Sequence, residues 1–202
     1  MASALHITEL LAAEEGEPGW YAALGVGYSD AGVKASFWLD SDRSSGSVDT
    51  GGLAGQAYVG YRFSPHRAIE AGFLYAGKTE FHGETDGFNS RWNAGRMFGR
   101  TRIDGLHIGA VGRWPVGDSG YALYAKGGLL FWDTTTYYKS TINDINHFNS
   151  DGVSPMLALG MDMNLWREWR LRAEYLYSTV NLERRVSVDV NMLTVSMVHS
   201  FP

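Results

Sequence analysis

Apolar and polar residues alternate along most of this chain, which is the pattern of β-strands that bury one face and expose the other. The alternation recurs in about eight segments, and no run of 18 or more apolar residues predicts a transmembrane helix. Repeated segments of this kind indicate an all-β protein. The predicted strands are residues 20–28, 52–63 and 68–81, followed by strands that begin at Leu106, Tyr121, Leu157, Leu171 and close to Leu193.

Short and long connections alternate between the predicted strands. Outer-membrane β-barrels have this layout, because their tight turns face the periplasm and their longer loops face outward. Eight strands is the smallest number for such a barrel, and side chains fill its interior. We therefore expect an eight-stranded antiparallel up-and-down transmembrane β-barrel without a wide aqueous channel. The turns are residues 64–67, 116–120 and 165–168, and the longer stretches are residues 29–51, 82–100, 140–152 and 182–187.

Charged side chains keep to one face of the predicted strands. In the strand from Leu171, for example, Arg172 and Glu174 share one face and the other face carries no charge. Five strands have such an uncharged face, and a Lys or Arg that faces lipid costs roughly 2–4 kcal/mol at the bilayer midplane. We therefore expect the charged faces to turn inward. The alternative is a soluble ligand-binding barrel of lipocalin type, apolar inside and polar outside.

Composition narrows the function without deciding it. The 202 residues suffice for one barrel and leave no room for a separate catalytic domain. Mean hydropathy is -0.19, but a barrel hides its lipid face in alternate residues, and the 25 glycines, 11 tyrosines and 7 tryptophans fit such strands. A net charge of -5 does not favour nucleic-acid binding. Because the chain has no cysteine, disulfides and cysteine-based metal sites are excluded, and no cofactor or metal is implied.

The first 19 residues differ from the rest of the chain. Ala2-Ser3-Ala4 has the small residues of a signal-peptidase site, but no apolar segment precedes it. We interpret residues 1–4 as the remnant of a removed signal peptide, with Met1 added or retained in cloning. Residues 1–19, which are acidic and carry Pro18, then form a periplasmic lead-in to a barrel at residues 20–202. The alternative is a flexible or weakly helical terminus.

Several short motifs resemble, in order and spacing, the transmembrane domain of the OmpA family. They are Trp20-Tyr21, Gly60-Tyr61, Glu70 with Gly72 and Gly77, Tyr124-Ala125-Lys126 with Gly128 and Trp132, Asp151-Gly152-Val153-Ser154-Pro155, Arg172-Ala173-Glu174-Tyr175, and the closing segment from Met192-Leu193 to Phe201. The resemblance implies an eight-stranded barrel that anchors the outer membrane of a Gram-negative bacterium. It also implies an interior network of ion pairs that can open a narrow pore.

The resemblance points to particular site residues. Two basic positions of the family pattern fall here on Gly25 and Val111, so the network is thinner than in the family. From the residues themselves, two roles stay open. The charges can be structural, because an unpaired buried charge is expensive, or they can gate a narrow ion-permeable pore. Carried over residue by residue, the network maps onto Glu70, Lys126, Asp162 and Arg172, with Glu174 beside them.

Aromatic residues in the predicted extracellular loops suggest a competing function, that of an adhesin or receptor. Exposed aromatic groups on loops can anchor a partner. The other interpretation places them in strand extensions and in the aromatic girdles at the rim. The residues concerned are Phe37-Trp38, Phe88 with Trp92, and Met97-Phe98.

We do not expect an enzyme. His199 precedes Ser200, but neighbouring strand residues point to opposite faces, so the two do not form a nucleophile and base. His147 lies near Ser150 and Asp151 in a predicted loop, where such a cluster is typical of solvated turns. The six histidines of the chain contain no other recognisable catalytic arrangement.

The predicted location defines the expected partners. We expect a monomer in contact with the lipid bilayer and with lipopolysaccharide. By resemblance to the wider class of outer-membrane barrels, the aromatic Phe201 at the end of the last strand is a signal for the outer-membrane assembly machinery. Pro202 either ends the protein one residue later or begins a linker to a periplasmic peptidoglycan-binding domain.

Overall fold

The computed structural model describes residues 18–39, 44–88, 94–140, 145–166, 168–182 and 186–201. Residues 1–17, Trp92 and Pro202, which were interpreted above from the sequence, lie outside these ranges. The described chain forms β1 (Gly19–Ala31), α2 (Ala35–Trp38), β2 (Ser44–Asp49), β3 (Gly51–Ser64), β4 (Arg67–Thr85), β5 (Gly95–Pro115), β6 (Tyr121–Ser140), β7 (Ile145–Trp166), β8 (Trp169–Leu182) and β9 (Val186–Ser200).

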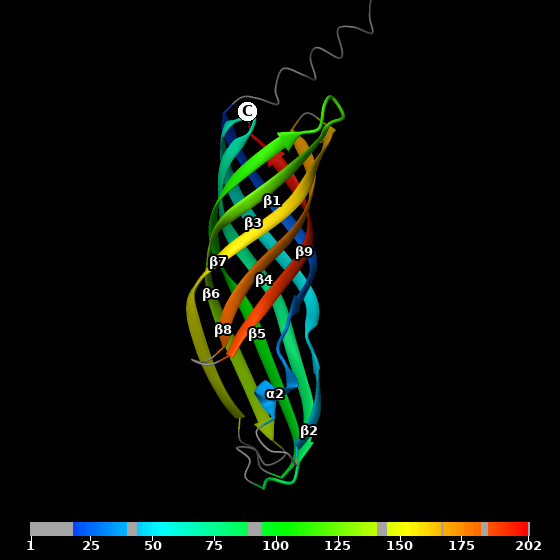
Figure 1. The fold of residues 1–202 in the computed structure, drawn as a ribbon, viewed down its shortest axis with the longest axis vertical. Coiled ribbons are helices and arrows are strands. Elements are labelled where there is room, and N and C mark those ends of the chain that lie inside the picture. Colours follow the sequence, from blue (N-terminus) through cyan, green and yellow to red (C-terminus); the bar gives the residue numbers. More distant parts are fainter. Residues whose placement is uncertain are drawn as a thin grey trace, which may run out of the picture.

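Eight of these strands close into a ring, in the order β1, β3, β4, β5, β6, β7, β8 and β9 (Figure 1). Every pairing is antiparallel, and β9 pairs with β1 to complete the barrel. The short strand β2 adds no ninth place to the ring. It pairs with residues 80–85 of β4, beyond the point where β3 begins. The prediction of an eight-stranded antiparallel up-and-down barrel is therefore confirmed.

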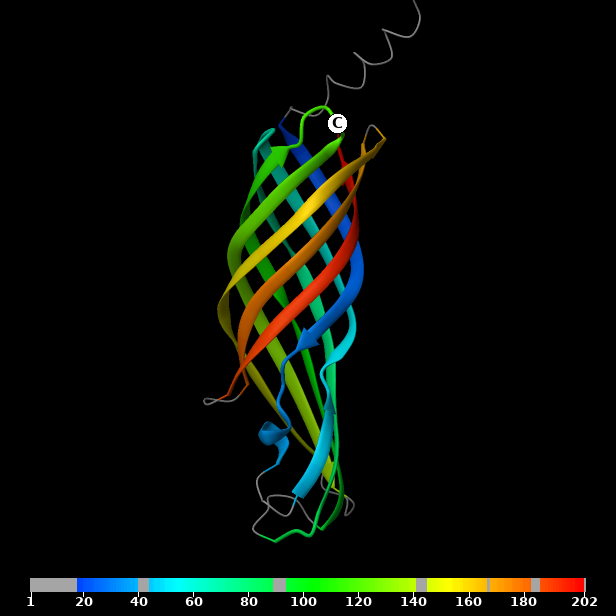
Figure 2. The same ribbon diagram turned by 45° about the vertical axis from the view of Figure 1, so that its right-hand side comes forward.

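The wall of the barrel is taller on one side than on the other. We call the extended part of β4 to β7 the tall wall. Strands β4 to β7 have 19–22 residues, whereas β1, β3, β8 and β9 have 13–15. The longer strands run roughly 20 Å further, toward the end where β2 and α2 lie (Figure 2). Much of what the sequence predicted as loops, residues 82–100 and 140–152, is therefore strand. The reason is that outward side chains there are polar, so the apolar lipid-facing signal is missing.

One strand switches faces partway along its length. On β4 the buried residues are Glu70 and Leu74 before the switch and Thr79 and Phe81 after it. The pairing with β5 shifts between Tyr75 and Lys78, where Gly77 has a φ of +76°. A bulge of this kind inserts one residue and reverses the alternation, and glycine adopts the required backbone at little cost. Alternation continued from Glu70 along β4 therefore gives the observed faces only as far as Ala76.

The outer surface of the ring has an apolar band, and it is polar beyond this band on the side where α2 and β2 lie. Large apolar side chains on this surface include Leu24 on β1, Leu106 on β5 and Leu157 on β7, each more than 60% exposed. On β4 the outward residues change from Phe73 to Lys78 and Glu80, which marks the edge of the band nearest α2 and β2. Exposed aromatic residues flank the band, as in the girdles of outer-membrane barrels: Trp20, Phe63, Trp114 and Trp166 on the turn side, and Tyr28, Phe131, Tyr175 and Tyr177 on the other.

Within the described ranges, no helix has the length and apolar character needed to cross a bilayer.

Candidate functional site

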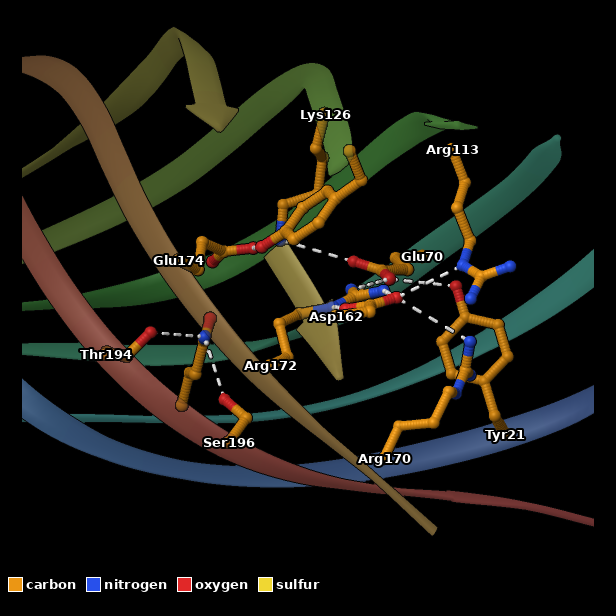
Figure 3. Close-up of polar contacts among 12 residues, drawn as sticks. Tyr21, Glu70, Arg113, Lys126, Asp162, Arg170, Arg172, Glu174, Thr194 and Ser196 are labelled. Atoms are coloured by element: carbon orange, nitrogen blue, oxygen red, sulfur yellow. Dashed lines mark hydrogen bonds and ion pairs between the residues drawn. The ribbon is translucent and has the colours of Figure 1, made fainter. Parts of the chain in front are cut away.

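The structure places all five predicted site residues in the lumen of the barrel (Figure 3). They come from four strands and their side chains are at most 2% exposed. Their inward orientation follows from the strand alternation, because each lies between two outward-facing neighbours. The residues are Glu70 on β4, Lys126 on β6, Asp162 on β7, and Arg172 and Glu174 on β8.

Arg172 is the centre of this cluster. It faces Asp162 directly in the β7–β8 ladder, and its guanidinium donates two hydrogen bonds to that carboxylate, Nε to Oδ1 at 2.7 Å and Nη2 to Oδ2 at 3.1 Å. Its third nitrogen, Nη1, donates to Glu70 on the other side of the lumen. A guanidinium is suited to this task because its donors are fixed in one plane. Arg172 thereby ties β7 and β8 to β4.

Lys126 extends the network in the other direction. Its Nζ lies 2.9 Å from Glu174 Oε2 and 3.2 Å from Glu70 Oε2. The five charges therefore alternate in sign along one path, Glu174, Lys126, Glu70, Arg172 and Asp162. Breaking a buried pair by removing one partner typically costs about 3–5 kcal/mol. Such a path cross-links the walls of the barrel from inside.

Two tyrosines complete the coordination of the carboxylates. The hydroxyl of Tyr21 donates to Glu70 Oε1 at 2.8 Å, and that of Tyr124 donates to Glu174 Oε2. The ring of Tyr124 also lies 4.1 Å from the guanidinium carbon of Arg172, and Tyr58 lies 5.3 Å from Lys126 Nζ. Cations over aromatic faces are stabilised by the ring quadrupole. These aromatic residues surround the charges and leave little space for water.

Two further arginines, which were not among the predicted site residues, belong to the network. Arg113 Nε lies 3.4 Å and Arg170 Nη1 lies 3.6 Å from Asp162 Oδ2. Both side chains are about nine-tenths buried. Their inward parity was readable from the strands, but parity does not give the offset between neighbouring strands that brings both arginines to Asp162.

Neutral groups occupy the places where the family pattern has two basic residues. Gly25 faces Gln56 in one ladder and Ser196 in the other. Gln56 Nε2 donates to Thr194 Oγ1 at 2.8 Å and to Ser196 Oγ at 3.3 Å (Figure 3). The second position, Val111, is buried beside the arginines. The lumen around Gly25 is therefore held by hydrogen bonds between uncharged side chains.

An apolar layer lies next to the charged one, toward the end opposite the tight turns. Two inward steps from Lys126 comes Leu130, and one inward step from Glu174 comes Leu176. These side chains pack in one cluster with residues from the other strands, and none of the following is more than 1% exposed: Leu74, Leu130, Met156, Leu176, Val190 and Met192. Charged and apolar layers together fill the middle of the lumen.

Two of the residues predicted to lie in extracellular loops, Trp38 and Met97, are buried against the tall wall, and Phe98 is half-buried. Trp38 on α2 is 1% exposed, and its ring stacks on Phe81 with centroids 5.5 Å apart. Met97 is buried on β5. Phe88 is exposed, and the side chain of Phe37 lies outside the described residues.

The His147, Ser150 and Asp151 cluster does not converge on one face of its strand. His147 and Asp151 are exposed on β7, and the strand alternation points Ser150 to the other face. Within the same described ranges, no three His, Asp or Glu side chains are grouped to hold a metal ion.

Comparison with known sequences points to one family. The family model described as "OmpA-like transmembrane domain" matches residues 15–202. Outer membrane protein A of Serratia marcescens is 22% identical over 78% of this chain, and that of Klebsiella pneumoniae is 24% identical over 77%. These matches cover 42% of each relative, so the chain spans less than half of their length.

Solved structures of outer-membrane barrels share the fold. Neisserial surface protein A superposes with a TM-score of 0.58 at 10% identity, covering 92% of this chain and 99% of that one. Ail, the attachment invasion locus protein of Yersinia pestis, solved in complex with the heparin analogue sucrose octasulfate, gives a TM-score of 0.54 at 15% identity, covering 91% and 99%. At these identities the likeness establishes the architecture alone.

Proposed function

The chain belongs to the family of OmpA-like transmembrane domains, and on that basis we propose that it is an anchor and integrity protein of the outer membrane of a Gram-negative bacterium. Its barrel spans that membrane in a closed state. The single observation that carries this proposal is the filled lumen. In it, five charges of alternating sign lie next to a buried apolar layer, on the side of the tight turns. Such an interior stabilises the ring and leaves no continuous aqueous path.

The ion-pair network acts first as a structural cross-link in this proposal. A narrow conducting state needs two changes at once, since Arg172 must release Asp162 or Glu70 and the layer around Leu130 must admit water. Apolar constrictions resist wetting and so oppose ion flow. Gating by Glu70, Lys126, Asp162, Arg172 and Glu174 is therefore a rare event that depends on the apolar layer.

Conductance across a planar bilayer tests this proposal. The comparison uses the parent protein, Arg172→Ala, Leu130→Ser and the double variant, each first shown to be folded by altered gel mobility before boiling. We expect the parent and both single variants to be silent in most recordings and the double variant to conduct. Steady conductance of the parent at the level of the double variant contradicts the closed state.

The lipid-facing surface supports the proposed partners. Apolar residues surround the ring, which suits a monomer in contact with acyl chains and lipopolysaccharide. Phe201 is 47% exposed just after β9, and its backbone N–H donates to the carbonyl oxygen of Trp20 at 2.9 Å. An exposed aromatic residue at the junction of β1 and β9 is accessible to the assembly machinery. Replacing Phe201 with Ala and measuring the fraction assembled in cells tests that role, with Phe88→Ala as the control.

The tall wall favours adhesion as a second candidate function. Strands β4, β5 and β6 together with β2 line a hollow of about 800 Å³ beyond the apolar band, with Arg96 and Lys139 among its residues. Ail, one of the similar barrels, was solved with a sulfated heparin analogue. Binding of immobilised heparin by intact cells, compared between the parent and an Arg96→Gln, Lys139→Gln variant, tests this candidate. Equal retention of both excludes the hollow as the binding surface.

A further inference from the structure

The turn-side mouth of the lumen holds more buried cations than carboxylates. Three guanidinium groups converge on Asp162 Oδ2, those of Arg172 at 3.1 Å, Arg113 at 3.4 Å and Arg170 at 3.6 Å (Figure 3). Arg172 already satisfies this carboxylate through two hydrogen bonds. One negative charge therefore faces three positive ones, and the only other acid near them, among the described network residues, is Glu70, which Lys126 shares.

The surplus arginines also have unsatisfied donors. The Nε groups of Arg113 and Arg170 are buried and make no hydrogen bond, although Arg113 Nε lies within ion-pair distance of Asp162. The Arg170 side chain is only 9% exposed, so bulk water does not replace the missing acceptor. A buried donor without a partner usually marks the place of an ordered water or an ion. Beside a concentration of positive charge, an anion is favoured over water.

A small cavity opens among these groups. It is lined by ten residues, five of which are the arginines at positions 62, 67, 113, 170 and 172, and none of which is acidic. Tyr21, Val111 and the turn residue Pro65 form part of the remaining wall. The centre of a water-sized particle has about 10 Å³ in which to move, so the cavity holds one such particle, and a single-atom anion somewhat larger than water fits with a small movement of the arginine side chains. Phosphate, sulfate and carboxylate groups are larger than this space.

We propose that this cavity is a binding site for one small inorganic anion of the size of chloride, held between Arg113 and Arg170 with Arg62 at its rim. The anion offsets the repulsion among guanidinium groups that Asp162 alone does not neutralise, and it accepts hydrogen bonds from the buried Nε groups. Arg62 comes from β3, Arg113 from β5 and Arg170 from β8, so a bound anion links three strands at the mouth of the barrel. This site is independent of any conducting state and of the proposed anchoring role.

Unfolding in two salts tests the site. The refolded protein in detergent micelles is titrated with sodium chloride against sodium gluconate at equal ionic strength, and the folded fraction is read from unboiled gels along a urea series. A ligand that binds only the folded state at ten times its dissociation constant lowers the unfolding equilibrium constant about tenfold. We expect that specific gain in the parent and its loss in Arg170→Gln. The matched control, Arg96→Gln, removes an arginine that is 88% exposed on the tall wall and should keep the gain.

Bromide in crystals of the parent protein provides a second measurement that needs no variant. We expect an anomalous bromide peak between the guanidinium groups of Arg113 and Arg170. A chloride effect of equal size in Arg170→Gln and Arg96→Gln would place the binding elsewhere and overturn the proposal. The absence of both a chloride effect and a bromide peak at this position would overturn it as well. If Arg170→Gln does not fold, the bromide peak in the parent decides.

Discussion

The ring of Tyr124 lies across Gly160, the residue directly opposite it in the β6–β7 ladder. Gly160 in turn faces Glu174 in the β7–β8 ladder, and the tyrosine hydroxyl reaches over the glycine to donate to that carboxylate. The same arrangement occurs again on the other side of the lumen. Tyr21 lies across Gly60, which faces Glu70, and donates to it. Each row of tyrosine, glycine and glutamate thus spans three neighbouring strands.

These rows predict that the glycines contribute to the site through their missing side chains. A Cβ at position 60 would lie 2.3 Å from the ring of Tyr21, so Gly60→Ala must displace the tyrosine from Glu70. We expect a loss of about 1–3 kcal/mol in the free energy of unfolding, measured by urea titration in micelles. The control is Gly127→Ala, whose Cβ would meet only Leu157 at 3.7 Å. Equal stability of the two variants would contradict this role of Gly60.

Removal of the central guanidinium should be costly. Arg172→Met leaves Asp162 and Glu70 without their principal partner, and we expect the free energy of unfolding to fall by about 3–5 kcal/mol. The control Arg100→Met removes an arginine that is 42% exposed and pairs with Glu80, which should cost at most about 1 kcal/mol. Combining Arg172→Met with Glu70→Gln should cost less than the sum of the single changes, because the two residues interact.

The apolar layer can be tested with two adjacent leucines. Leu130 is fully buried in the lumen, whereas Leu129 faces the lipid and is 46% exposed. We expect Leu130→Ala to lower the free energy of unfolding by about 2–5 kcal/mol, because it leaves a cavity in a packed interior. Leu129→Ala should cost clearly less. The reverse order, measured by urea titration, would mean that the faces of β6 are assigned the wrong way round.

The packing of α2 predicts a local effect. Trp38→Ala removes the stack on Phe81 and should release the segment around α2 from the tall wall while the ring stays closed. Limited proteolysis should then cleave within residues 32–39 at least several times faster, and the unboiled protein should keep its altered gel mobility. Phe88→Ala, at an exposed position, serves as the control and should leave cleavage unchanged. Cleavage at the parent rate in both variants would show that Trp38 does not hold this segment.

The tall wall also predicts a dependence on pH. Burial alone would raise the pKa of Glu80, but the hydrogen bond from Lys78 and the positive charge of Arg100 outweigh it and hold the pKa below its usual value. Glu80 lies above the apolar band. A depressed carboxyl pKa stabilises the fold above the unfolded-state pKa, and that stability is lost as the pH falls through the folded-state value. The protection factors of the β4 amides in native-state hydrogen exchange, which are corrected for the intrinsic pH dependence of exchange, should therefore fall on acidification, and Glu80→Gln should remove this part of the response. The same acid response in both proteins would assign it to other groups.

Strand alternation was sufficient to predict the ring and its inward charges. Arg172 and Glu174 on the same parity, opposite an uncharged face, required the charged side to be the lumen once a bilayer surrounds the barrel. The strand ends of the tall wall were not predictable in this way. Beyond the apolar band, Lys78 and Arg100 replace apolar residues on the outer face, so the contrast between the two faces disappears. The bulge at Gly77 reversed the parity of β4 without a signal in the alternation itself.

The contacts of the site depend on register, which alternation does not determine. Arg113 and Arg170 were both readable as inward, yet their convergence on Asp162 follows from how β5, β7 and β8 are offset around the ring. The pairing of Tyr21 with Gly60 likewise depends on the stagger between β1 and β3. A glycine in a strand indicates close approach of another group, but the sequence alone does not say which tyrosine approaches it.

The seam between β1 and β9 determines the order in which the barrel can form. Every other pairing in the ring joins strands that follow one another along the chain, apart from the short β2, and can therefore form locally. The seam joins Tyr21 to Ser200, so among the pairings of the ring it closes the longest stretch of chain and has the largest loop-closure cost. When the seam is open, β1 and β9 each have an edge of unpaired backbone groups, which the hydrocarbon of the bilayer does not tolerate. Pairing of β9 with β1 is thus what leaves the ring without an exposed strand edge in the hydrocarbon of the bilayer.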